Sequence, residues 1–192
     1  MELKNNMKTF QAKTRNEWRK WLEKHHRSED SVWLIIYKKD SEIPSVYYPE
    51  AVEEALCFGW IDSKAIKRDN KSHYQFFTKR NPKSNWSKIN KEKAAKLIEQ
   101  GLISEAGLNL IEIAKQSGTW AALDEVENIT IPDDLQLLFK KNKLAFTNWE
   151  QFPSSSRKRI LQWILNAKRP ETRQKRIEET VKLAKQNLRA NH

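Results

Sequence analysis

A chain of 192 residues has room for one domain or two small ones. Hydrophobic residues make up 38% of it and charged residues 32%, and eight tryptophans exclude a disordered chain, because disordered segments are poor in aromatic residues. Four glycines and six prolines leave little room for many tight turns. This composition argues against a β-sandwich or barrel and favours a fold rich in helix.

Three features of the sequence indicate the cellular compartment of the protein. No apolar run approaches the roughly 20 residues that span a bilayer, and residues 1–6 lack the apolar stretch of a secretory signal. A single cysteine, Cys57, rules out an intramolecular disulfide and fits a reducing compartment. We therefore expect a cytoplasmic protein with no membrane span.

Charge is distributed unevenly along the chain. The formal net charge is +11, and it is concentrated in residues 64–93 and 151–192, each of which carries a net charge of +8. Such basic patches attract anions, so the candidate partners are an anionic small molecule, an acidic protein surface or nucleic acid. A solvated basic surface without a dedicated ligand is the alternative.

The first part of the chain predicts a small sheet packed by helices. Thr14 and Glu17 have the spacing of a capping box before a helix over 15–26. Residues 31–37 are aromatic and β-branched, which is typical of a buried strand, and residues 60–67 and 74–77 read as a hairpin. Further helices are expected over 49–58, 90–100 and 104–117.

The second part predicts a compact helical unit. Residues 119–131 read as a linker, and helices begin near Pro132, Pro153 and Pro170, the last running to about Leu188. We therefore expect an α+β, predominantly α-helical protein with a small antiparallel sheet, divided into residues 1–128 and 129–192.

Known catalytic and metal motifs are missing from the sequence. It has no Gly-rich phosphate loop, no zinc-binding spacing and no nucleophile elbow, and we expect neither a metal nor a cofactor. Cys57 lies in an apolar stretch, where a buried unreactive thiol is the ordinary interpretation. The pair Glu53-Glu54 is most simply a solvated helix face.

Two stretches combine tryptophan, small polar residues and cations, as binding pockets do. The candidate ligand-binding residues in them are Trp60, Asp62, Ser63, Arg80, Ser84, Trp86 and Ser87. In this hypothesis the cations hold an anion, the tryptophans stack, and Ser and Asp orient the ligand. The structural alternative is that the tryptophans belong to the core, that Asp62 caps a turn, and that Ser84 or Ser87 caps the next helix.

These stretches also carry a family resemblance. The chain resembles the YdeI/OmpD-associated family over roughly 15–190, in the strings Tyr48-Pro49-Glu50-Ala51, Glu54-Ala55-Leu56-Cys57-Phe58-Gly59-Trp60-Ile61-Asp62-Ser63, Phe77-Thr78-Lys79-Arg80, Ser84-Asn85-Trp86-Ser87 and Ala167-Lys168-Arg169-Pro170-Glu171-Thr172-Arg173-Gln174-Lys175-Arg176-Ile177. The last string resembles that family's bacteriocin-protection domain. The resemblance implies a soluble bacterial protein linked to stress or bacteriocin resistance, with no settled enzymatic activity.

The C-terminal string supplies two further candidates, Arg173 and Arg176, three residues apart near a helix start. They either bind an anion or pair with Glu178, Glu179 or an acid of the first domain and dock the two halves. The sequence thus favours a non-enzymatic binder of an anionic ligand or acidic partner. A nucleic-acid-binding module and an enzyme that uses Asp62 as a base beside Arg80 are the alternatives.

Overall fold

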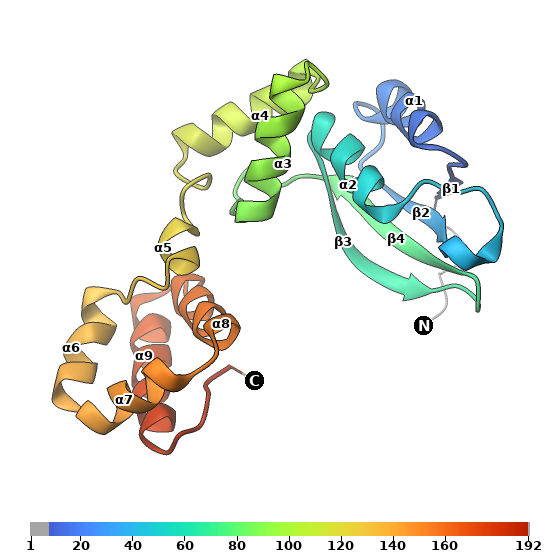
Figure 1. The fold of residues 1–192 in the computed structure, drawn as a ribbon. Helices are drawn as coiled ribbons and strands as arrows, with labels where there is room; N and C mark the ends of the chain where they lie inside the picture. Colours follow the sequence, from blue (N-terminus) through green and yellow to red (C-terminus); the bar gives the residue numbers. More distant parts are fainter. Residues whose placement is uncertain (1–7, 192) are drawn as a thin grey trace. The chain divides into compact units, whose positions relative to one another are not determined.

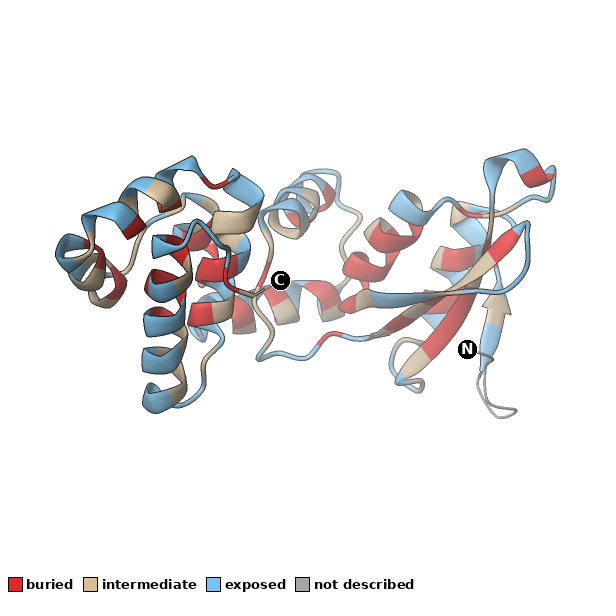
Figure 2. Ribbon diagram, turned by 90° about the horizontal axis from the view of Figure 1, so that it is seen from below, coloured by how far each residue is buried: buried red, intermediate tan, exposed pale blue. Residues whose placement is uncertain are grey.

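The computed structural model describes residues 8–191, so residues 1–6, on which the signal-peptide prediction rests, lie outside the described part. The chain divides into two compact units, residues 1–121 and 122–192 (Figure 1). Helices account for 53% of the chain and strands for 14%, which confirms an α+β fold dominated by helix. Helix and strand residues alternate between buried and exposed positions, as Figure 2 shows.

The N-terminal unit is built on a four-stranded sheet in the order β1-β2-β4-β3. Its strands are β1 (Thr9–Gln11), β2 (Ser31–Tyr37), β3 (Trp60–Lys67) and β4 (Ser72–Lys79). The predicted hairpin is β3–β4, and β4 also pairs antiparallel with β2. The sheet is nevertheless mixed, because β1 joins β2 in parallel. A strand of three residues is too short to show an alternating pattern, so the sequence did not predict it.

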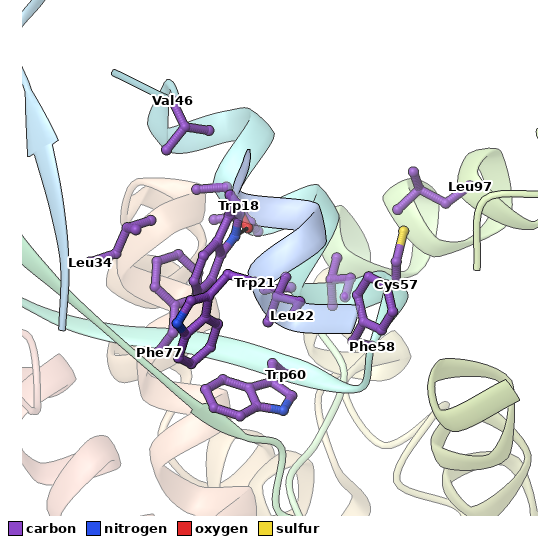
Figure 3. Close-up of a cluster of buried hydrophobic side chains, with 14 of the residues drawn as sticks. Trp18, Trp21, Leu22, Leu34, Val46, Cys57, Phe58, Trp60, Phe77 and Leu97 are labelled. Atoms are coloured by element: carbon purple, nitrogen blue, oxygen red, sulfur yellow. Dashed lines mark hydrogen bonds between the residues drawn. The ribbon is translucent and has the colours of Figure 1, made fainter. Parts of the chain in front are cut away.

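Two helices, α1 (Arg15–His25) and α2 (Tyr48–Cys57), supply much of the core of this unit. Thr14 caps α1 as predicted by accepting from Glu17 N at 3.2 Å, but the Glu17 carboxylate returns to Lys13 N rather than to the cap residue. Trp18 is fully buried and stacks on Trp21 with ring centroids 5.1 Å apart (Figure 3). Large aromatic side chains thus dominate the burial in this core.

Two more helices, α3 (Lys88–Glu99) and α4 (Glu105–Gln116), complete the unit, with a 3-10 turn η1 at Lys39–Ser41. The Cys57 carbonyl at the end of α2 accepts two bonds from Ser104, from its N–H at 3.0 Å and its hydroxyl at 2.7 Å. A Cβ at Gly107 would lie 2.5 Å from that carbonyl oxygen. Only glycine allows α4 to approach the end of α2 this closely.

The C-terminal unit consists of helices around its own apolar core. They are α5 (Asp124–Glu127), α6 (Asp133–Lys141), α7 (Lys143–Gln151), α8 (Ser154–Leu165) and α9 (Pro170–Lys185). Phe139, Trp149, Ile164 and Ile177 are almost completely buried in it. The helices beginning near Pro132, Pro153 and Pro170 were predicted, whereas α7, which follows a break at Asn142, and α5, inside the expected linker, were not.

Candidate functional site

The two tryptophans of the predicted N-terminal site lie in the core. Trp60 is fully buried at the start of β3, and its indole N–H donates to the His26 carbonyl at 3.3 Å. Trp86 is 3% exposed and packs against Trp120 with ring centroids 5.0 Å apart. Neither ring is free to stack on a ligand, so the structural alternative describes both residues.

Arg80 is the unusual member of this group. It is 6% exposed, its guanidinium carbon lies 4.0 Å from the centre of the Trp86 ring, and its Nη2 donates to the Asn85 carbonyl at 2.6 Å. Its Nε is buried and has no hydrogen-bond partner among the described residues, and burial lowers the pKa of Arg80 to about 10. By contacting the Trp86 ring and the Asn85 carbonyl, the Arg80 guanidinium stabilises the loop between β4 and α3, and it remains charged at neutral pH.

The polar members of the group are distributed over several local structures. Asp62 is half-buried and accepts from the Tyr48 hydroxyl at 2.6 Å, and burial together with this bond raises the pKa of Tyr48 to about 12. Ser63 is exposed. Ser87 caps α3 by accepting from Asn90 N, whereas the Ser84 hydroxyl donates to Asn81 O within a turn.

The alternative of an enzyme places Asp62 beside Arg80, but no ion pair joins these two residues in the described part of the chain. Trp60, Asp62 and Ser63 belong to β3, whereas Arg80, Ser84, Trp86 and Ser87 belong to the loop between β4 and α3, whose first residue donates from its N–H to the Gly59 carbonyl at 3.0 Å. Trp60 and Trp86 are core residues, and Ser87 is a helix cap.

Neither Arg173 nor Arg176 pairs with a glutamate of α9. Arg173 makes a bidentate contact with Asp134 of α6, through Nε at 2.7 Å and Nη2 at 3.0 Å, which keeps the pKa of that carboxyl below its ordinary value. Arg176 donates to the Trp163 carbonyl, and its guanidinium lies 4.9 Å from the centre of the Trp163 ring. Both arginines therefore have partners within the C-terminal unit, and Asp134 replaces the expected acid of the first domain.

The Glu53-Glu54 pair also differs from its prediction as a solvated face. Glu54 is 2% exposed and accepts from Arg15 Nε at 2.5 Å and from Arg19 Nη1 at 2.8 Å. Cys57, one turn later, is buried, and burial raises the pKa of its thiol to about 11. A group of three or more His, Cys, Asp or Glu side chains suited to a metal ion is absent from residues 8–191.

A polar cavity of about 310 Å³ lies at the N-terminus of α8. Its lining combines the first turn of that helix with the segment that follows α9: Pro153, Ser155, Ser156, Arg159, Arg189, Ala190 and Asn191. Neither Arg159 nor Arg189 forms an ion pair with a carboxylate of the described residues. The cavity therefore contains two arginines that have no carboxylate partner among residues 8–191.

The helix start itself leaves donors available. Pro153 has no side chain that could cap α8, and the first turn contains no acidic residue. The N–H groups of Ser156 and Arg157 donate to the Pro153 carbonyl, but within residues 8–191 those of Ser154 and Ser155 have no acceptor. Unpaired N–H groups at a helix N-terminus, with the positive end of the helix dipole, favour an anion.

The end of α9 brings Arg189 to this cavity. Asn187 adopts a left-handed conformation with φ of 56°, and the bonds Asn187 N to Ala184 O and Leu188 N to Leu183 O form a Schellman motif that reverses the chain. Ala190 is then buried in the core of the unit, and Arg189 Nη1 contacts the Ser156 hydroxyl at 3.4 Å. Sequence reasoning missed this site, although Asn187 and the basic C-terminal segment were the signals that could have indicated it.

Comparison with known proteins assigns the two parts of the chain to different families. Residues 10–110 match a domain of unknown function, DUF8412, and residues 128–187 match the family described as Bacteriocin-protection, YdeI or OmpD-Associated. The YdeI/OmpD-associated resemblance, expected over 15–190, is thus shown for the C-terminal part. No curated protein and no solved structure matches the chain significantly. None of the helices in the described part is long and apolar enough to cross a membrane.

Proposed function

The chain belongs to the family of the domain of unknown function DUF8412 and carries a YdeI/OmpD-associated region at residues 128–187. From this premise we propose that the protein binds a small anion that carries a phosphoryl group. The cavity at the start of α8 is the binding site. The observation that carries the proposal is the convergence of Arg159, Arg189 and the uncapped first turn of α8 on one cavity.

Each part of the cavity has a role in this proposal. The planar guanidinium groups of Arg159 and Arg189 supply forked donors that match the spacing of phosphate oxygens. The hydroxyls of Ser155 and Ser156 and the backbone N–H groups of Ser154 and Ser155 supply further donors to the same anion. A volume of about 310 Å³ suits a small molecule, at the lower end of the range for ligand pockets.

Binding without catalysis is the simpler form of the proposal. The residues that line the cavity offer hydroxyls, guanidinium groups and one amide, and none of these is a general base at neutral pH. We also propose that the protein acts in the bacterial cytoplasm in tolerance of stress or of a bacteriocin, a role for which the description of the C-terminal family is the support.

Isothermal titration calorimetry with inorganic pyrophosphate tests the site. Arg159→Gln and Arg189→Gln should each raise the Kd at least tenfold, because each loses charge-assisted hydrogen bonds that contribute about 1.5–3 kcal/mol. Lys168→Gln is the matched control, since Lys168 is an exposed cation of the same unit that does not line the cavity.

Retained pyrophosphate binding in both arginine variants, or an equal loss in Lys168→Gln, would contradict the site. Absence of binding by the parent chain at about 50 mM salt would contradict the proposed function itself. The Arg159→Gln/Arg189→Gln double variant, expressed in bacterial cells challenged with a bacteriocin, then tests whether tolerance depends on the site.

A further inference from the structure

The sheet of the N-terminal unit has two faces of different character. Val32, Leu34 and Ile36 of β2 belong to the apolar core, with Phe77 of β4 beside them. Side chains alternate along a strand, so the residues between them point to the opposite, outer face. The strand register places Trp33 opposite Phe76 and Ile35 opposite Tyr74 on that outer face, and none of these four side chains is part of the core cluster.

Aromatic rings dominate the outer face. Trp33 is 2% exposed and contacts Phe76 and Tyr74, with ring centroids 4.8 and 6.4 Å apart. Phe76 and Tyr74 are themselves only half-buried, as is Tyr37 at the end of β2. A row of half-buried rings on neighbouring strands offers flat apolar surfaces at the spacing of a sheet.

Two cations stand beside these rings. A β-bulge in β3 between Asp62 and Ala65 shifts the register and turns Lys64 to the outer face, where its Nζ lies 5.4 Å from the centre of the Trp33 ring and 5.7 Å from that of Phe76. Arg68 lies similarly, 5.7 Å from the centre of the Tyr37 ring and 5.9 Å from that of Tyr74. Both residues are exposed, and Arg68 Nη1 also donates to the Tyr37 hydroxyl at 2.9 Å and lies 3.6 Å from Asp69 Oδ2.

A cavity of about 450 Å³ adjoins this face at one end, with Trp33 and Phe76 in its lining. Glu29 and Asp30 also line it, and they form ion pairs with Lys8 and Lys79, so the proposal assigns no phosphate contact to this end. The β3–β4 hairpin that carries this face is basic, since residues 60–79 hold five basic and two acidic residues.

We propose that the outer face of this sheet binds single-stranded nucleic acid. Bases stack on Tyr37, Tyr74 and Phe76, while Lys64 and Arg68 move from beside the rings to the phosphates. Aromatic platforms next to cations are the means by which single strands are bound without sequence preference, because every base has a π-face. An acidic protein surface would use the cations but would leave the rings without a role.

Fluorescence anisotropy with a fluorescein-labelled single strand of about 20 thymidines, and with a duplex of the same length, tests the proposal. At about 50 mM salt the full chain should bind the single strand at least tenfold more tightly than the duplex. Tyr74→Leu and Phe76→Leu should each raise the Kd about tenfold, as expected for the loss of one base–ring stack. Lys64→Gln and Arg68→Gln should each lower the slope of log Kd against log salt by about 0.7.

Matched controls separate this surface from other sources of binding. Phe146→Leu removes a half-buried ring from the C-terminal unit, and Lys88→Gln removes an exposed cation outside the sheet face; neither should change the Kd more than twofold. The Arg159→Gln/Arg189→Gln double variant should bind the single strand with unchanged Kd. A failure of the proposal for the anion cavity can thus be distinguished from a failure of the proposal for the sheet face. Equal affinity for the duplex, unchanged binding by Tyr74→Leu and Phe76→Leu with native circular dichroism, or no binding at all would each overturn the proposal.

Discussion

Glu54→Gln should destabilise the N-terminal unit by about 3 kcal/mol, estimated from the geometry of one buried carboxylate. Glu54 accepts two hydrogen bonds from guanidinium groups, at 2.5 Å from Arg15 and 2.8 Å from Arg19. Hydrogen bonds to charged groups contribute about 1.5–3 kcal/mol each, and glutamine keeps an acceptor for only one of the two. The side chains of Arg15 and Arg19 are 35% and 26% exposed, so water can hydrate a guanidinium group that loses its partner. We therefore expect a loss of unfolding free energy near the lower end of the roughly 3–5 kcal/mol that breaking a buried ion pair costs.

Urea denaturation followed by tryptophan fluorescence measures this loss. Six of the eight tryptophans lie in the N-terminal unit, so the signal reports mainly on it. With an m-value of about 1.5 kcal/mol per molar urea, the midpoint should fall by about 2 M. Glu53→Gln is the matched control, because Glu53 makes a single 3.0 Å contact with Arg15 and is 29% exposed; it should lose less than about 1 kcal/mol. Equal midpoints for the two variants would refute the reasoning.

Two further predictions concern titratable groups. Burial raises the pKa of Cys57 to about 11, so at pH 8 the native thiol should react with a disulfide reagent at least about a hundredfold more slowly than in urea; a comparable rate would show an accessible thiolate. Arg173 lowers the pKa of Asp134 from its ordinary 3.8, so the folded unit holds this proton more weakly than the unfolded chain. The resulting stability, less than about 1 kcal/mol at this exposed pair, is present above about pH 4 and lost as the pH falls. Asp134→Asn should remove that part of the acid dependence in urea titrations at pH 3 and 6, and an unchanged dependence would contradict the assignment.

The fold could be predicted where local signals and packing agreed. The Thr14 cap and the tryptophan spacing predict α1, and the prolines at 49 and 170 lie at the first turn of their helices, as the structure confirms. The features that escaped prediction depend on contacts distant in sequence. β1 acquires its strand conformation by pairing with β2, and α7 is stabilised by burying Trp149, which no local signal distinguishes from an exposed tryptophan.

Charge was the least informative signal, since a sequence does not show which charges are already paired. Arg173 and Arg176 looked available, but Asp134 and Trp163 occupy them. Arg80 lies under a ring, and Glu54, which looked solvated, is buried between two arginines. Arg189 is the opposite case. It follows a chain reversal at Asn187 that places it near Arg159, thirty residues earlier, and neither arginine forms an ion pair with an acid of residues 8–191. The net charge of a segment therefore predicts a ligand poorly. A stronger criterion for an anion site is a pair of arginines that have no carboxylate partner and lie beside N–H donors that have no acceptor, because an incoming anion stabilises such a group most.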